Sequence, residues 1–239
     1  MELGPFNGFG VEFKRRGGFY NGQLLLSEKG ANVLKILARC GAMSGSQIRI
    51  LTEASKSTMK TLIEKGFIDI YESGKTPPVY TLGQGGAEII NASYRIWDTI
   101  GLLRTVAANQ LWVNLFWPDA EWDPYREFPV LTKGSSRYLV AAPRLRIEEP
   151  VLASKVFNYE DRVIIVAASE RQLRETILLD PLAPERVRYT WDVLLKDGVT
   201  FYRLNGSRLV LDSIFSSQNH TEKIPEKIFQ KSIDSRMAI

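Results

Sequence analysis

Three short apolar patterns at helical spacing follow one another between residues 27 and 66. The patterns begin at Ser27, Ser44 and Ser55, and a serine caps a helix by accepting a hydrogen bond from an amide of the first turn. Gln47 follows Ser44 at the spacing of a capping box. The sequence therefore predicts three short helices, and the tight connection between the second and the third is typical of a helix-turn-helix. The residues expected to face the core are Val33, Leu34, Ile36, Leu37, Cys40, Ile48, Leu51, Ala54, Met59, Leu62 and Ile63.

After the third helix the hydrophobic period changes from helical to alternating. One strand begins at Phe67 and a second covers Val79–Leu82. Pro77 and Pro78 fall in the loop between them, where a missing amide costs no ladder hydrogen bond. Two such strands after a helix-turn-helix indicate a winged helix over residues 27–94, with the loop as its wing.

The wing contains Gly74-Lys75-Thr76, which could end a phosphate-binding P-loop. The motif G-x-x-x-x-G-K-[ST] needs another glycine five residues before Gly74, and that position is Asp69. Two prolines follow, and they would end the helix that a P-loop lysine opens. We therefore expect Lys75 to project from a wing toward a DNA backbone rather than to hold a nucleotide.

The second helix of a helix-turn-helix enters the DNA major groove with its N-terminal residues facing the bases. Lysine and arginine suit phosphates or guanine, and hydroxyl groups reach bases or phosphates. The alternative is that these charges form a solvated face and that the winged helix contacts proteins. The candidate DNA-binding residues are Lys56, Ser57, Thr58, Lys60 and Thr61 on this helix, Lys75 on the wing, and Lys14, Arg15 and Arg16 near the N-terminus.

Residues 1–26 carry glycines, aromatic residues and this last basic run. Their pattern predicts either a short hairpin, turned at residues 17–18 or 21–22, or a basic arm.

The hydrophobic pattern of residues 84–117 predicts a largely helical segment that joins two domains or mediates dimerisation. Gly85 and Gly86 mark a break at its start, and Gly101 is a second candidate break. The residues expected to bury one side are Ile89, Ile90, Ile96, Ile100, Leu103, Val106, Ala107 and Leu111.

The pattern from about residue 118 onward is mixed α/β, so we expect an α/β domain over 95–216 and a C-terminal tail over 217–239. Residues 117–125 have the polar composition of a loop. Expected strands are Tyr125–Thr132, Ser136–Arg146 and Arg162–Ser169, expected helices are 148–160 and 170–180, and a hairpin turn is expected at Asn205-Gly206.

Composition limits the function classes. The single cysteine, Cys40, permits no internal disulfide and fits a reducing cytoplasm. The single histidine, His220, argues against His-based metal sites and Ser-His catalysis. No stretch approaches the ~20 apolar residues of a membrane span, and the N-terminus does not fit a signal peptide. The net charge of +4 permits an anionic partner. We expect no cofactor, no metal and no membrane association.

The order of these motifs resembles the winged-helix proteins of the replication-relaxation family, which occur on plasmids and other mobile elements. The resemblance lies in ILARCGAMSGSQIRILTEASKSTMKTLIEKGFIDIYESGKTPPVYTLGQGGAEII, and then in ANQLWVNL and RVIIVAASERQLRETI, within residues 27–180. It implies a C-terminal domain similar to restriction-endonuclease-like folds. It also implies a role with DNA in the replication or maintenance of a mobile element.

A metal-dependent nuclease needs clustered carboxylates and a lysine, commonly an acid followed by E-x-K on adjacent strands. The strand after Ser136 is where E-x-K belongs, and it places Ala141, Ala142 and Pro143 there. Glu127 is the one acid expected on a strand. We therefore expect an inactive fold with no catalytic residues. The other acids considered are Asp119, Glu121, Asp123, Glu148 and Glu149.

Cys40 and three tryptophans are expected to have structural roles. Cys40 ends an apolar helix face and is expected in the core. Three of the tryptophans, Trp112, Trp117 and Trp122, are close enough in sequence to cluster as core or as an interface.

The sequence thus predicts an α+β chain, in which an N-terminal winged helix-turn-helix precedes an α/β domain resembling a degenerate restriction-endonuclease-like fold. We expect a cytoplasmic protein that binds double-stranded DNA in the replication, maintenance or regulation of a plasmid, phage or other mobile element. The second domain would either mediate homo-oligomerisation, with a dimer as the expected state, or bind a replication or mobile-element protein. The alternatives are a Mg²⁺-dependent nuclease and a protein-interaction adaptor that does not bind DNA.

Overall fold

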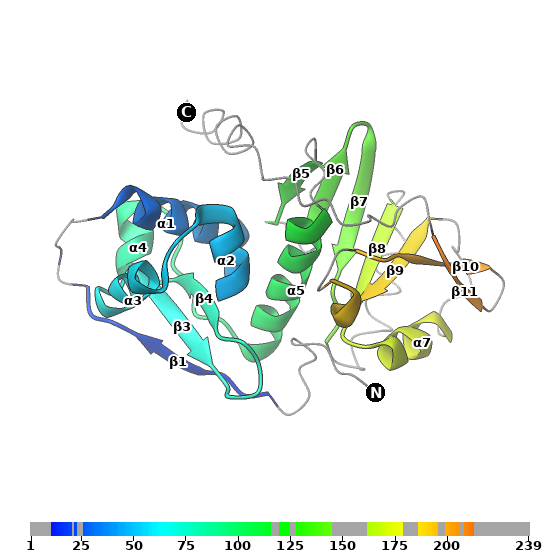
Figure 1. Cartoon of the computed structure of the whole chain (residues 1–239), viewed down its shortest axis with the longest axis horizontal. Coiled ribbons are helices and arrows are strands. Elements are labelled where there is room, and N and C mark those ends of the chain that lie inside the picture. The colour runs from blue at the N-terminus through cyan, green and yellow to red at the C-terminus, as the bar shows by residue number, and fades with distance from the viewer. Residues whose placement is uncertain are drawn as a thin grey trace.

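The structure is a computed structural model that describes residues 11–20, 22, 26–115, 120–124, 128–144, 162–178, 186–195, 199–205 and 208–212. Helices and sheets both contribute, as expected of an α+β chain (Figure 1). The elements are β1 Lys14–Gly17, α1 Glu28–Cys40, β2 Ala42–Ser44, α2 Gly45–Thr52, α3 Lys56–Glu64, β3 Ile68–Glu72, β4 Val79–Leu82, α4 Gln84–Ile89, α5 Thr99–Leu115, β5 Ala120–Asp123, β6 Val130–Lys133, β7 Ser136–Ala141, β8 Arg162–Ala167, α7 Glu170–Leu178, β9 Val187–Trp191, the 3-10 helix η2 Asp192–Leu195, β10 Tyr202–Asn205 and β11 Arg208–Leu211.

The three helices expected at the capping serines are confirmed as α1, α2 and α3. The Ser27 hydroxyl accepts a hydrogen bond from the Gly30 amide at 3.1 Å, and Ser55 accepts one from the Thr58 amide at 3.1 Å. Ser44 and Gln47 form both bonds of the capping box. These caps satisfy amides that a helix start would otherwise leave without partners.

The N-terminal sheet has four strands in the order β1-β3-β4-β2. Strands β3 and β4 lie where the sequence predicts them, whereas β1 and β2 are additions. Residues 14–17 are neither one arm of a local hairpin nor a free arm, because β1 pairs antiparallel with β3, more than fifty residues later in the chain. A strand edge offers unpaired amides and carbonyls, and β1 satisfies those of β3.

The expected long helix over residues 84–117 is instead two helices, α4 and α5, separated by a segment without helix or strand at 92–98. Asn91 has φ 51°, a left-handed backbone that stops α4. The Asp98 carboxylate accepts a hydrogen bond from the Gly101 amide at 2.7 Å and starts α5. The break leaves Ile96 65% exposed, although the helical pattern predicted it buried.

Helix α5 lies between the two sheets (Figure 1). Along α5 only Arg104 is exposed, and an apolar surface on all sides is typical of a helix buried by neighbours on all sides. One cluster of buried side chains joins Leu34 of α1, Leu111 of α5 and Ile164 of β8. The core therefore runs without interruption from the N-terminal part, residues 11–98, into the C-terminal part, residues 99–212.

The C-terminal sheet has seven strands in the order β11-β10-β9-β8-β7-β6-β5. Its strands β7, β8 and β9 are parallel, and the remaining neighbours are antiparallel. Side chains of one face join the core around α5, and those of the other pack with Leu173 of α7. Strand β8, helix α7 and the antiparallel pairing of β10 with β11 confirm the sequence-based expectations, and Gly206 of the expected turn lies outside the described residues.

Strand β5 corrects the expectation of a polar loop over residues 117–125. Glu121 is exposed while Trp122 is buried, so the alternation of a strand is present in a short polar stretch. The expected helix over 148–160, the tail over 217–239, Trp117, Asp119, Glu127, Glu148, Glu149 and His220 lie outside the described residues.

Within the described ranges, no helix combines the length and the apolar character that a bilayer crossing requires.

The continuous core predicts that the two parts unfold together. Leu111 is fully buried, so Leu111→Ala is expected to lower the free energy of unfolding by about 2 to 5 kcal/mol. Urea titrations followed by far-UV circular dichroism and by tryptophan fluorescence measure this change, and the two signals should share one midpoint. Ile96→Ala, at an exposed site, is the control and should change little. Two separate midpoints in the native protein would contradict a shared core.

Candidate nucleic-acid interface

Helix α3 turns its polar side toward solvent. Lys56, Ser57, Lys60 and Thr61 are exposed and Thr58 is half-buried. On the opposite side Met59 and Leu62 are buried in the core. The candidate residues of this helix therefore share a surface, as the helical spacing predicts.

The hydroxyl groups at the start of α3 contact one another. The Ser55 hydroxyl lies 2.8 Å from the Ser57 hydroxyl and 2.9 Å from the Thr58 hydroxyl. A hydroxyl has one donor and two acceptor positions, and Ser55 uses all three because it also accepts from the Thr58 amide. The hydroxyls of Ser57 and Thr58 keep capacity for a further partner. Lys60 approaches Glu64 at 3.7 Å one turn later, but both side chains are largely exposed and such a pair is weak.

The β3–β4 loop forms a turn and not a phosphate-binding loop. Asp69 lies inside β3, and Gly74 has φ 70°, a left-handed conformation that suits glycine. The Ser73 hydroxyl accepts hydrogen bonds from the amides of Lys75 at 3.2 Å and of Thr76 at 3.1 Å. These amides are thus engaged within the turn, while the side chain of Lys75 is exposed at its tip.

Strand alternation divides the basic run of β1 between the two faces of the sheet. Arg16 pairs with Ile70 of β3 and Arg15 with Tyr71, and directly paired residues share a face. Tyr71 packs with Leu102 and Leu103 of α5. Arg15 therefore lies on the α5 side. Arg16, and Lys14 two residues before it, lie on the side of α3.

On the α5 side, Arg15, Asp69 and Tyr94 form a polar cluster that fixes β1 in place. Arg15 Nε donates to Asp69 Oδ2 at 2.8 Å, and an Arg15 Nη2 also donates to the Tyr94 hydroxyl. The Tyr94 hydroxyl donates to Asp69 Oδ2 at 3.3 Å. The hydrogen bond to Asp69 raises the pKa of Arg15. Gly17 leaves room for this carboxylate, because a Cβ there would lie 2.2 Å from Asp69 Oδ1.

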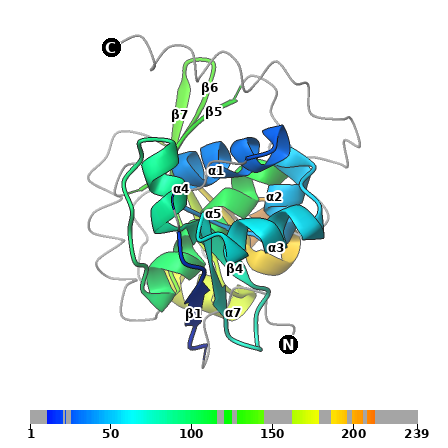
Figure 2. The same cartoon turned by 90° about the vertical axis from the view of Figure 1, so that its left-hand side faces the viewer.

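A groove of about 780 Å³ lies between β1, α2, α3 and the start of β4. Among the described residues that line it, the charged ones are Arg16, Arg49, Lys56, Lys60 and Glu64. Figure 2 looks onto this end of the molecule, with α3 and β1 in front of α5. The groove brings Lys56, Lys60 and Arg16 together, whereas Arg15 lies on the far face of the sheet and does not line it.

Arg49 and Tyr80, which the sequence patterns did not single out, line the groove beside the predicted residues. Arg49 lies on the exposed side of α2, next to Ile48, which is fully buried. The helical period of α2 could have placed Arg49 on an outer face. That Arg49 and Arg16 line one groove could not be read from local sequence, because it depends on the pairing of β1 with β3.

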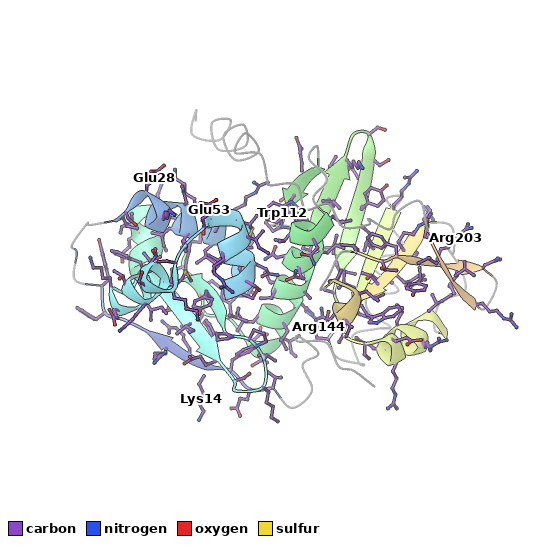
Figure 3. The ribbon with its side chains drawn as sticks, in the orientation of Figure 1. Lys14, Glu28, Glu53, Trp112, Arg144 and Arg203 are labelled. Atoms are coloured by element: carbon purple, nitrogen blue, oxygen red, sulfur yellow. The ribbon has the colours of Figure 1, made fainter. Side chains whose placement is uncertain are left out.

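The other residues considered, Cys40, Trp112 and Trp122, have structural roles. Cys40 is buried, and burial raises the pKa of its thiol to about 12, so it stays a protonated core residue. Trp112 and Trp122 stack with ring centroids 6.1 Å apart. Trp112 lies at the junction of the two parts (Figure 3). Within the described ranges, no group of three or more His, Cys, Asp and Glu side chains could hold a metal ion.

No protein-family model, curated protein or solved structure matches the chain. The resemblance to the replication-relaxation family therefore stays a prediction.

The polar cluster predicts different effects for two neighbouring arginines. Arg15→Ala leaves the buried Asp69 carboxylate without its cation, and we expect a loss of about 1 to 3 kcal/mol in the free energy of unfolding. Arg16→Ala removes a pair with Glu72 in which both side chains are exposed, so the loss should stay below about 1 kcal/mol. Chemical unfolding of both variants measures the difference, and equal losses would contradict the assigned role of Arg15.

Proposed function

We propose that the protein binds double-stranded DNA, with residues 27–94 acting as a winged helix-turn-helix. The observation that carries this proposal is the groove in which cations from β1, α2 and α3 face a shared concave surface. A positively charged concave surface attracts the phosphate backbone, and neutralised phosphates release counterions into solution.

The order of elements supports a winged helix. The sequence α1, β2, α2, α3, β3, β4 places a helix-turn-helix before two antiparallel strands with a loop at their tip. Helix α3 presents its cations and hydroxyls outward while Met59 and Leu62 hold it to the core. In such an arrangement α3 would enter the major groove, and Lys75 on the β3–β4 loop would reach a neighbouring phosphate.

The charge balance of the groove also supports a polyanionic ligand. Its single carboxylate among the described residues, Glu64, already lies 3.7 Å from Lys60. Arg16, Arg49 and Lys56 add further positive charge around the same space. An acidic protein surface would also be attracted, but it lacks the condensed counterions whose release gives duplex binding its steep salt dependence.

For the C-terminal part we propose a restriction-endonuclease-like fold without catalytic activity. Helix α5 precedes the antiparallel strands β5, β6 and β7, and β8 then returns parallel to β7, an order that supports this proposal. Strand β7 and the residues after it carry Ala141, Ala142 and Pro143 where acidic ligands would be needed. A role in the replication, maintenance or regulation of a mobile element, through a dimer or a partner protein, rests on the family resemblance.

Binding to a fluorescently labelled duplex, measured by anisotropy at several salt concentrations, tests the proposal. We expect binding that weakens steeply with salt, and a Lys56→Ala/Lys60→Ala variant that binds clearly more weakly because two cations of α3 are lost. The matched control is Arg203→Ala/Arg208→Ala. It removes two exposed cations from β10 and β11, at the opposite end of the molecule from Lys14 (Figure 3).

Equal weakening by both double variants would indicate a diffuse charge effect and contradict recognition through α3. Absence of binding at low salt would contradict DNA binding altogether. A supercoiled plasmid incubated with the protein and Mg²⁺ tests the inactive C-terminal part, since nicking would overturn that proposal.

Lys75→Ala tests the loop separately. If Lys75 contacts one phosphate, its removal should lower the slope of log affinity against log salt by about one unit, with the folded state unchanged. The slope is obtained from the same anisotropy titrations. An unchanged slope would place the loop away from the DNA.

A further inference from the structure

Two walls of the groove carry an arginine each. Arg16, Gly17 and Gly18 of the β1 segment line one side, and Arg49 lines another from α2. Tyr80 of β4 lies within the same lining. A Cβ on Gly45, the first residue of α2, would lie 3.3 Å from the Tyr80 ring, so α2 rests closely on this residue.

Both arginines act on the Tyr80 hydroxyl. Burial raises the pKa of Tyr80, Glu72 adds to this rise, and Arg49 and Arg16 each oppose it. Arg16 pairs with Ile70 and Ile70 pairs with Tyr80, so Arg16 and Tyr80 lie on one face of the sheet, and Arg49 lines the same groove. The two cations therefore face a common space although they come from elements far apart in the sequence.

Neither arginine is held by a strong ion pair. Arg49 Nε donates to the Gly45 carbonyl at 3.4 Å, and no carboxylate among the described residues pairs with it. Arg16 lies 3.3 Å from Glu72, but the side chains are 66% and 46% exposed. Exposed pairs contribute about 0 to 1 kcal/mol, so a phosphate can take the place of Glu72.

Backbone contact holds the segment after β1 against α3, which also lines the groove. The Gly18 amide donates to the Ile63 carbonyl at 3.0 Å. A Cβ on Gly18 would lie 2.3 Å from the carbonyl oxygens of both Ile63 and Glu64, so only glycine permits this approach. The Arg15–Asp69 pair holds β1 from the other face of the sheet.

We propose that this groove holds one sugar–phosphate strand of a DNA duplex, with Arg16 and Arg49 contacting phosphates from opposite walls. This inference rests on the proposed function and extends it to a specific binding mode. A groove of about 780 Å³ is in the range of small-ligand sites. A volume of this size holds a group as large as a small ligand and not a whole duplex, so one backbone can enter it. Arginine offers the fork of donors that matches phosphate oxygens.

The test uses the full chain and measures the salt slope of duplex binding for Arg16→Ala, Arg49→Ala and the double variant. Each single change should lower the slope by about 0.9, the value for one phosphate contact, and the double variant by about twice that. Arg16→Lys and Arg49→Lys keep the charge and should keep most of the slope while losing the bidentate contact. Arg203→Ala is the control and should leave the slope unchanged.

The outcomes distinguish a failure of the groove assignment from a failure of the proposed DNA binding. If the native protein binds duplex and Lys56→Ala/Lys60→Ala weakens binding, but the arginine variants keep the native slope, the groove assignment is overturned while the proposed function stands. If the native protein shows no salt-dependent binding, both are overturned. Circular dichroism and thermal unfolding of each variant show whether a lowered slope comes from a folded protein, and only a folded variant with a lowered slope supports the proposal.

Discussion

The rest of the structure depends on the packing of α5 against both sheets. Three buried polar contacts fix its register on the N-terminal part. Gln47 Nε2 donates to the Val106 carbonyl at 2.8 Å, and Asn109 Nδ2 donates to the carbonyls of Cys40 at 3.0 Å and Ala42 at 2.8 Å. Buried polar groups are costly without partners, so these bonds permit few alternative positions of the helix.

Helix α5 also contacts strand β5 of the C-terminal part, through Asn109 and Trp112. Asn109 Oδ1 accepts from the Trp122 indole at 3.1 Å, and Trp122 stacks on Trp112. Arg39 of α1 donates to the Trp122 carbonyl at 3.2 Å and lies over the Trp112 ring. A hydrogen-bonded and stacked connection of this kind holds the two parts in one relative orientation. The charged groove lies at one end of the molecule, and the C-terminal sheet forms the other end (Figure 1).

Local signals predicted the elements that depend on neighbouring residues. The serine caps and Gln47 located α1, α2 and α3, and the alternating pattern located β4 at the observed residues. The elements that depend on distant contacts could not be predicted in this way. Strand β1 forms because β3 offers an edge, and that pairing decides which of Arg15 and Arg16 faces the groove. Arg49 lines the groove only because the fold places α2 and β1 around the same space.

Hydrogen–deuterium exchange of the whole chain with and without a DNA duplex tests the central claim most directly, because it shows which surface the DNA covers. The account predicts slower exchange in β1, in the N-terminal turns of α2 and α3 and in the β3–β4 loop, with β10 and β11 unchanged. Protection confined to the C-terminal sheet, or no protection at a DNA concentration that saturates binding, would contradict the assignment of the groove as the DNA-binding surface.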